Sequence, residues 1–175
     1  DISSKNGRSI AENFLAVKAF VMVDVSYSMA DTDAGNGKSR WEVANSELEK
    51  LQNQMPGAVA VGCFSSIAKF CANGVIDAPN GGTNVVEALA LLKHADGSQI
   101  RLILISDGEP QDGDKGMKIA RTFKSKMDTI YVGREDGHGR KYLQELSAQT
   151  GGVSLRQDAS QLNLLNQNIQ LLLGA

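Results

Sequence analysis

Short apolar runs alternate along the chain with longer segments in which apolar residues recur at every third or fourth position. The apolar runs predict strands at 19–25, 58–64, 68–72, 101–106, 128–133 and 153–156. The periodic segments predict helices at 39–55, 84–95, 115–127, 139–152 and 160–173. Because strands alternate with helices, the pattern indicates parallel β-α-β units joined by right-handed crossovers.

One pair of strands departs from this pattern. Only "SSI" separates 58–64 from 68–72, and such a short connection requires an antiparallel pair. The run "RLILIS" at 101–106 is almost continuously apolar, which is typical of a central parallel strand buried on both faces. We therefore predict an α/β fold with a doubly wound, mostly parallel central sheet, one antiparallel edge strand and helices on both faces.

Local signals mark the ends of the first helix. Ser39 is followed three residues later by Glu42, which predicts a capping box at the start of the helix. Pro56-Gly57 predicts its end. One face of this helix carries Trp41, Ala44, Leu48, Leu51 and Met55.

Polar residues gather where predicted strands end. Asp24–Ser28 follows the first strand, Ser106–Gly108 follows the "RLILIS" strand, and 81–84 ("GGTN") precedes a helix. Ligands of such folds bind beyond the carboxyl ends of the strands. These segments offer carboxylates and hydroxyls but no nitrogen or sulfur ligand. An all-oxygen set suits Mg²⁺, Mn²⁺ or Ca²⁺ and not zinc.

Each of these residues also has a simpler structural explanation. Asp24 or Ser28 alone fits a helix or loop cap, and Thr83 alone fits an N-cap of the next helix. Asp107-Gly108 alone fits a turn. The prediction of a metal site therefore depends on the whole set, in order along the chain: Asp24, Ser26, Ser28, Thr83 and Asp107.

This set resembles the metal-ion-dependent adhesion site of the von Willebrand A family, also called integrin I-like domains. The family motif is D-x-S-x-S, then a later Thr, then a later Asp followed by Gly. It is matched by "DVSYS", by the Thr of "GGTN" and by the Asp-Gly of "ISDGEP". The resemblance runs from about Ala19 to Leu173, in element order as well as motif, and the motif is complete.

The resemblance implies a role for each matched residue. Ser26, Ser28 and Thr83 would be direct or nearly direct ligands of Mg²⁺, or of Mn²⁺ or Ca²⁺. Asp24 and Asp107 would act through water. An Asp or Glu of a partner protein would complete the coordination, which makes the domain a non-enzymatic, metal-dependent interaction module. The alternative within this class is a metal with only a structural role.

The composition argues against two classes of binding partner, nucleic acids and membranes. The 175 residues carry a formal net charge of -2 at pH 7 and include 22% charged residues, which gives no global attraction for nucleic acid or an anionic membrane. No apolar run in the sequence is long enough to span a bilayer. We expect one monomeric domain over 1–175, with 1–16 as an N-terminal extension or remnant.

The number and position of the cysteines help to predict the cellular compartment of the protein. Cys63 and Cys71 lie in the antiparallel pair of strands, and we expect buried, reduced thiols, with a cross-strand bridge as the alternative. Few cysteines and no apparent signal segment favour a cytoplasmic, bacterial protein.

The alternative function is nucleotide binding by a phosphate-binding loop. Gly37-Lys38-Ser39 precedes a helix, as such a loop would require. Against it, Thr32 stands where the first glycine belongs, and Asp31 and Asp33 would repel phosphate. We expect "ADTDAGNGK" to be an exposed polar loop near the metal site. A hydrolase is disfavoured because the two histidines, His94 and His138, have no evident triad partner.

Overall fold

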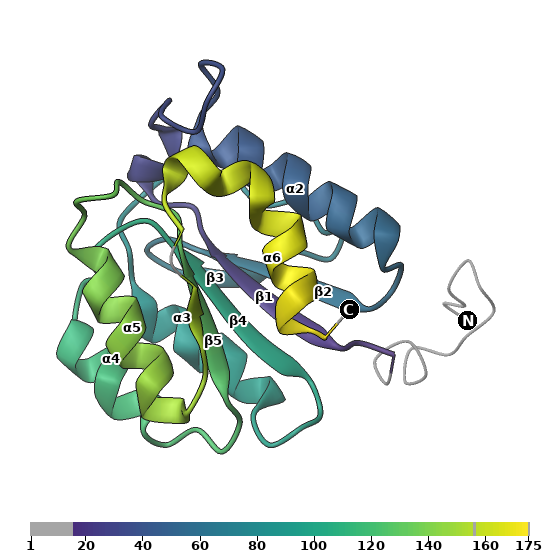
Figure 1. Ribbon diagram of the computed structural model, residues 1–175. Coiled ribbons are helices and arrows are strands. Elements are labelled where there is room, and N and C mark those ends of the chain that lie inside the picture. Colours follow the sequence, from purple (N-terminus) through teal and green to yellow (C-terminus); the bar gives the residue numbers. More distant parts are fainter. Residues whose placement is uncertain (1–15, 156, 175) are drawn as a thin grey trace.

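A twisted central sheet runs through the molecule, and helices cover both of its faces (Figure 1). The structure is a computed structural model that describes residues 16–155 and 157–174. Within these residues the strands form one sheet in the order β3-β2-β1-β4-β5-β6. Their bounds are β1 Ala19–Asp24, β2 Val59–Phe64, β3 Ala68–Phe70, β4 Arg101–Ser106, β5 Met127–Tyr131 and β6 Ser154–Leu155.

The direction of the strands confirms the predicted fold class. β3 pairs with β2 in the antiparallel sense, whereas β1, β2, β4, β5 and β6 are parallel neighbours. β4 lies between β1 and β5, as its continuous apolar run predicts. The predicted extension 1–16, apart from Ala16, and Arg156 of the last predicted strand lie outside the described residues.

The helices divide between the two faces of the sheet (Figure 1). On one face lie α2 Arg40–Gln54 and α6 Leu165–Leu172, and on the other α3 Val85–Leu92, α4 Gly113–Ala120 and α5 Gly139–Thr150. Short 3-10 turns are η1 Tyr27–Ala30, η2 Lys93–Ala95 and η3 Ala159–Leu164. No helix in the described part of the chain is long and apolar enough to cross a membrane.

Alternation along the central strands creates a core on each side of the sheet. Val21 and Ile103 point into the core beneath α2 and α6, whereas Met22 and Leu104 point into the core beneath α3 and α5. All four side chains are fully buried, and each such burial contributes about 1.5–3 kcal/mol. This double core fixes the carboxyl ends of β1 and β4 side by side.

Local signals were most accurate at the start of α2. Ser39 caps the helix: its hydroxyl accepts from the Glu42 amide at 3.1 Å, and the Glu42 carboxylate accepts from the Ser39 amide at 2.7 Å. The predicted capping box is confirmed. The helix ends at Gln54, just before Pro56, as predicted.

Two predicted helices differ most from the structure. The helix predicted at 115–127 ends at Ala120, because the carboxylate of Asp96 accepts from the amides of Lys124 and Ser125 at 2.9 and 2.8 Å. This contact turns the chain before β5. The last helix predicted at 160–173 instead begins as the 3-10 turn η3, and only α6 is α-helical.

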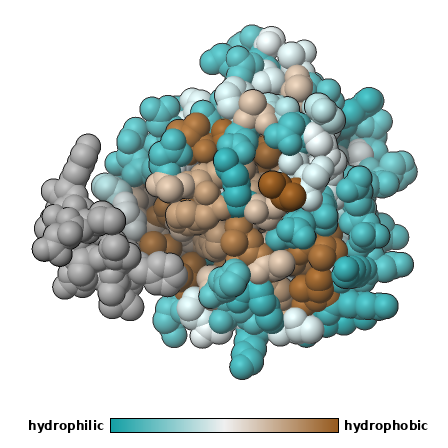
Figure 2. Space-filling model, turned by 180° about the vertical axis from the view of Figure 1, so that it is seen from behind, coloured by the Kyte–Doolittle hydropathy of each residue, from teal (hydrophilic) through white to brown (hydrophobic). Residues whose placement is uncertain are grey.

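The rear face of the molecule carries exposed apolar side chains (Figure 2). Ile67, Phe70 and Val75, which belong to β3 and its flanking loops, are 67%, 55% and 50% exposed. Beneath this edge, Cys63 and Cys71 are buried with their sulfur atoms 3.4 Å apart. Both cysteines are buried, free thiols in this structure, as predicted.

Candidate metal-binding site

Three loops meet at the carboxyl edge of the sheet. β1 and β4 are parallel neighbours with Val23 opposite Ile105, so the residues that follow them emerge side by side. The third loop is tied to both, because the Tyr27 amide donates to the Gly81 carbonyl at 3.1 Å and the Gln111 amide donates to the Thr83 carbonyl at 2.8 Å. The three polar segments predicted from the sequence therefore share one place.

Asp24 shapes the turn that leaves β1. Its side chain is fully buried, and one carboxylate oxygen accepts from the Ser26 amide at 2.7 Å. The other oxygen accepts from the Ser106 hydroxyl at 2.6 Å. Both oxygens are thus used inside the protein, so Asp24 links the ends of β1 and β4 and directs Ser26 toward the shared edge.

A row of oxygen atoms continues from Ser26 to Asp107. The hydroxyl oxygens of Ser26 and Ser28 lie 3.1 Å apart, and the Ser28 hydroxyl donates to Asp107 Oδ1 at 2.7 Å. Neighbouring ligand oxygens of an octahedral Mg²⁺ lie about 2.9 Å apart, given metal–oxygen distances of roughly 2.05 Å. The 3.1 Å between the two serine hydroxyls therefore fits adjacent ligands of a magnesium-class ion, and the hydrogen bond to Asp107 holds Ser28 in place.

Thr83 faces the same point. Its side chain is buried, and a methyl group built on Gly108 would lie 3.7 Å from Thr83 Oγ1 and 3.9 Å from Ser28 Oγ. The N-cap of α3 is Asn84, whose side-chain oxygen accepts from the Glu87 amide at 3.4 Å. The simpler explanation of Thr83 as the cap of this helix is therefore wrong, and its hydroxyl lies near Gly108, as does that of Ser28.

The donor set is oxygen alone, and most of it is uncharged. Within 16–155 and 157–174, no group of three His, Cys, Asp or Glu side chains could hold a metal ion. A cation at this edge would therefore depend on the serine and threonine hydroxyls, which suits a hard ion.

The structure adds one residue that our sequence analysis missed. Arg40, the first residue of α2, is 2% exposed. Its Nη1 donates to Asp107 Oδ2 at 2.9 Å, and its Nε and Nη2 donate to the two carboxylate oxygens of Asp33 at 2.7 and 2.6 Å. The available signal was its position four residues before Ala44, on the apolar face of the helix.

Burial and charge perturb the acids of the site. Burial, together with the nearby charge of Asp107, raises the pKa of Asp24 to about 6, against the opposing hydrogen bonds from Ser106 and Ser26. Burial also raises the pKa of Asp107, although Ser28 and Arg40 favour its charged form. Burial lowers the pKa of Arg40, but its contacts with Asp33 and Asp107 raise it by more.

The raised pKa of Asp24 predicts how the metal-free protein responds to pH. Between about pH 4 and 6 the folded state holds a proton that the unfolded state, with a pKa near 3.8, has lost. The free energy of unfolding should therefore fall as pH rises through this window, by up to about 3 kcal/mol. Urea unfolding in EDTA at several pH values measures it. Asp24→Asn should remove the contribution of Asp24 and make this slope smaller, and an unchanged slope would contradict the assignment.

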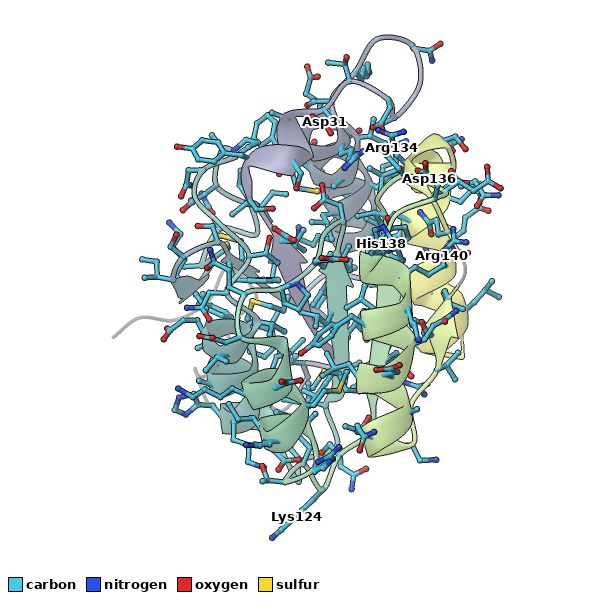
Figure 3. The ribbon with its side chains drawn as sticks, turned by 90° about the vertical axis from the view of Figure 1, so that its left-hand side faces the viewer. Asp31, Lys124, Arg134, Asp136, His138 and Arg140 are labelled. Carbon is cyan, nitrogen blue, oxygen red and sulfur yellow. The ribbon has the colours of Figure 1, made fainter. Side chains whose placement is uncertain are left out.

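The loop before α2 is exposed as predicted, except that Ala34 is buried and that Asp31 and Asp33 form ion pairs with Arg40. Figure 3 places Asp31 near Arg134 and Asp136 at this end of the molecule. The nucleotide-binding alternative gains no support here, because the Ser39 hydroxyl is already used as a helix cap.

Comparison with known proteins gives a consistent answer at the level of fold. No family model and no curated protein matches the sequence. Among solved structures, an aerotolerance-related membrane protein from Bacteroides fragilis, bearing multiple mutations to serines, is 19% identical with a TM-score of 0.71, over 90% of this chain and 98% of that one. BatB from Bacteroides thetaiotaomicron is 18% identical with a TM-score of 0.64, over 91% and 100%.

A third similar structure carries the family name. A von Willebrand factor type A protein from Catenulispora acidiphila is 19% identical with a TM-score of 0.59, and the match covers 87% of this chain and 42% of that protein. Sheet order, strand directions and helices on both faces agree with this likeness. The chain thus has the fold of von Willebrand A-type domains.

Proposed function

We propose that this domain binds a magnesium-class cation at the carboxyl edge of the sheet and uses it to hold a carboxylate of a partner protein. Ser26, Ser28 and Thr83 would supply ligands, with Asp24 and Asp107 orienting them or acting through water. The observation that carries the proposal is the row of oxygens from Ser26 to Asp107, spaced 3.1 and 2.7 Å apart.

The chemistry of the ligands favours an external carboxylate. Hydroxyls are neutral, so they leave a bound divalent cation with unbalanced positive charge. Such an ion accepts one more oxygen ligand readily, and a carboxylate is the strongest oxygen donor that a protein offers. We propose binding rather than catalysis.

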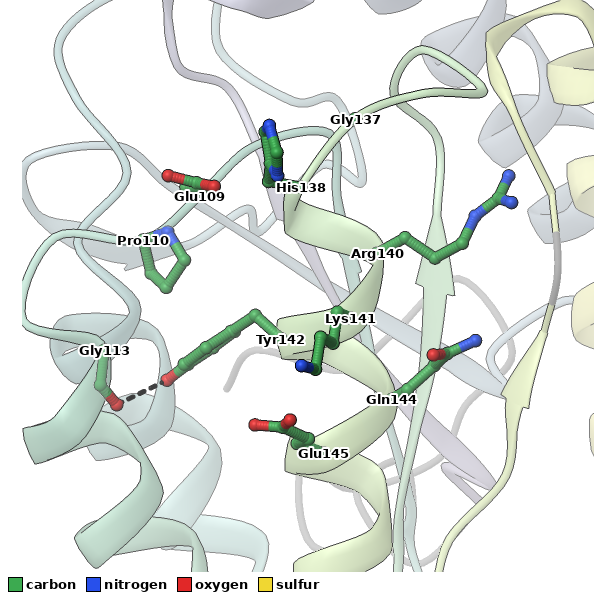
Figure 4. Close-up of a pocket in the computed structure, with 10 residues that line it drawn as sticks. All are labelled: Glu109, Pro110, Gly113, Gly137, His138, Arg140, Lys141, Tyr142, Gln144 and Glu145. Atoms are coloured by element: carbon green, nitrogen blue, oxygen red, sulfur yellow. Dashed lines mark hydrogen bonds between the residues drawn. The ribbon is translucent and has the colours of Figure 1, made fainter.

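The surroundings suit a protein partner. Tyr27, between the two serines, is 71% exposed, and exposed tyrosines are frequent anchors of protein interfaces. A shallow groove of about 810 Å³ between α4 and α5 adjoins the site, lined by residues that include Glu109, His138 and Lys141 (Figure 4). The first residue of α5, Gly139, packs against the Gly108 backbone, so groove and site form one surface.

Titration with Mg²⁺ and Mn²⁺ by isothermal calorimetry tests the proposal. We expect one site in the wild type and no measurable site in the double variant Ser26→Ala, Ser28→Ala. Ser46→Ala, an exposed serine on α2, is the matched control and should bind normally. Equal binding by the double variant would contradict the proposal.

A second measurement separates an interaction role from a purely structural metal. We expect EDTA to leave the circular dichroism spectrum unchanged while abolishing the NMR response of the site to glutarate, a simple dicarboxylate. Unfolding in EDTA would instead favour the structural alternative. The monomeric state and the cytoplasmic location stay predictions.

A further inference from the structure

Arg40 places a positive charge directly against the candidate metal site. Its guanidinium contacts Asp107 at 2.9 Å and Asp33 at 2.6 Å, and its side chain is 3% exposed. It also reaches the Ser28 carbonyl at 3.4 Å. The guanidinium thus joins α2 to the loop before it and to the loops that carry Ser28 and Asp107.

How far the positive charge of Arg40 is compensated depends on the solvent exposure of the carboxylates that contact it. The side chain of Asp107 is fully buried, whereas those of Asp33 and of Asp31, which lies 3.4 Å from Arg40, are 40% and 58% exposed. Water and salt screen an exposed charge far better than a buried one. Asp31 and Asp33, both exposed to solvent, therefore compensate Arg40 only in part, and some positive charge remains effective at the edge of the sheet.

The buried side chains Asp24, Asp107 and Arg40 carry one net negative charge, which a bound divalent cation changes to one net positive charge. Asp24 and Asp107, when ionised, together neutralise the ion, and Arg40 adds one positive charge that is nearly inaccessible to solvent. A like charge lowers the affinity for the cation, and an opposite charge raises the affinity for an incoming carboxylate.

We propose that Arg40 is a specificity-determining residue that keeps the metal-loaded site net positive, favouring capture of the partner's carboxylate at the expense of cation affinity. The inference rests on the proposed function, because it concerns the same site. It predicts opposite changes in two affinities when the charge is altered. A merely structural role for Arg40 would weaken both affinities together.

The experiment compares three variants with the wild type. Mg²⁺ affinity is measured by calorimetry, and glutarate affinity is measured at saturating Mg²⁺ from the amide NMR signals of Ser28 and Gly108. For Arg40→Gln we expect Mg²⁺ binding to tighten and glutarate binding to weaken, each by about 10-fold. For Asp33→Asn, which removes an exposed carboxylate, we expect both changes with reversed sign.

Arg40→Lys keeps the charge and should retain values near those of the wild type. Thermal unfolding of each variant checks that it is folded, and Asp33→Asn decides the question alone if Arg40→Gln does not fold. Affinities that change in the same direction in Arg40→Gln, or that do not change in Asp33→Asn, would overturn this inference only. A wild type that binds no Mg²⁺ would overturn the proposed function and this inference with it.

Discussion

Replacing Asp107 with alanine is expected to weaken Mg²⁺ binding by about 100-fold, as loss of a residue that orients metal ligands often does. Asp107 Oδ1 accepts from the Ser28 hydroxyl, and Oδ2 accepts from Arg40. The variant removes a negative charge from the site and frees the hydroxyl to turn away. It also leaves the Arg40 guanidinium without its buried partner, so the fold should be less stable.

Calorimetry of the single variant and of the double variant Asp24→Ala, Asp107→Ala measures this effect. The double variant should show no binding. Asp136→Ala is the matched control, because it removes the same charge from a side chain that is 76% exposed and contacts Arg134 instead. Equal Mg²⁺ binding by the wild type and the double variant would refute the metal site.

Gly152→Ala is expected to give a large loss of stability. A methyl group at this position would overlap the carbonyl group of Met127, which is the first residue of β5. Backbone cannot move aside as a flexible side chain can, so β5 and the segment leading to β6 would separate. We expect the free energy of unfolding to fall by about 3 kcal/mol, as measured by urea denaturation.

Gly57→Ala separates this steric effect from backbone strain. Gly57 has a positive φ of 72° and open space around its missing side chain, so alanine there should cost only about 1–2 kcal/mol. A Gly152→Ala protein as stable as Gly57→Ala would show that the strands tolerate the extra methyl group.

Much of the fold could be predicted because its signals are local. β4 was predicted with its observed bounds, because a continuous apolar run of this length indicates a strand that is buried on both faces. The start of α2 was predicted because Ser39 and Glu42 act within one turn. The end of α4 was not, because it depends on Asp96, which lies 28 residues before Lys124 in sequence.

The same distinction explains the candidate site. Its five residues stand in recognisable positions at strand and helix ends, and the structure brings them to one edge of the sheet. Arg40 could not be assigned, because its contact with Asp107 joins residues 67 positions apart. Nothing in the sequence around an arginine at the start of a helix indicates which distant acidic residue it contacts.

The short edge strand β3 has a consequence for how copies of the protein behave together. Unpaired backbone at a sheet edge invites strand-to-strand association between molecules, most of all where apolar side chains flank it. Here the edge is only Ala68–Phe70, and at its centre Lys69 forms an ion pair with Asp77 at 2.8 Å. A strand from another copy could form few backbone hydrogen bonds with β3, and pairing there would desolvate the charged side chain of Lys69. The short, charged edge strand therefore disfavours aggregation through the neighbouring apolar face at high protein concentration.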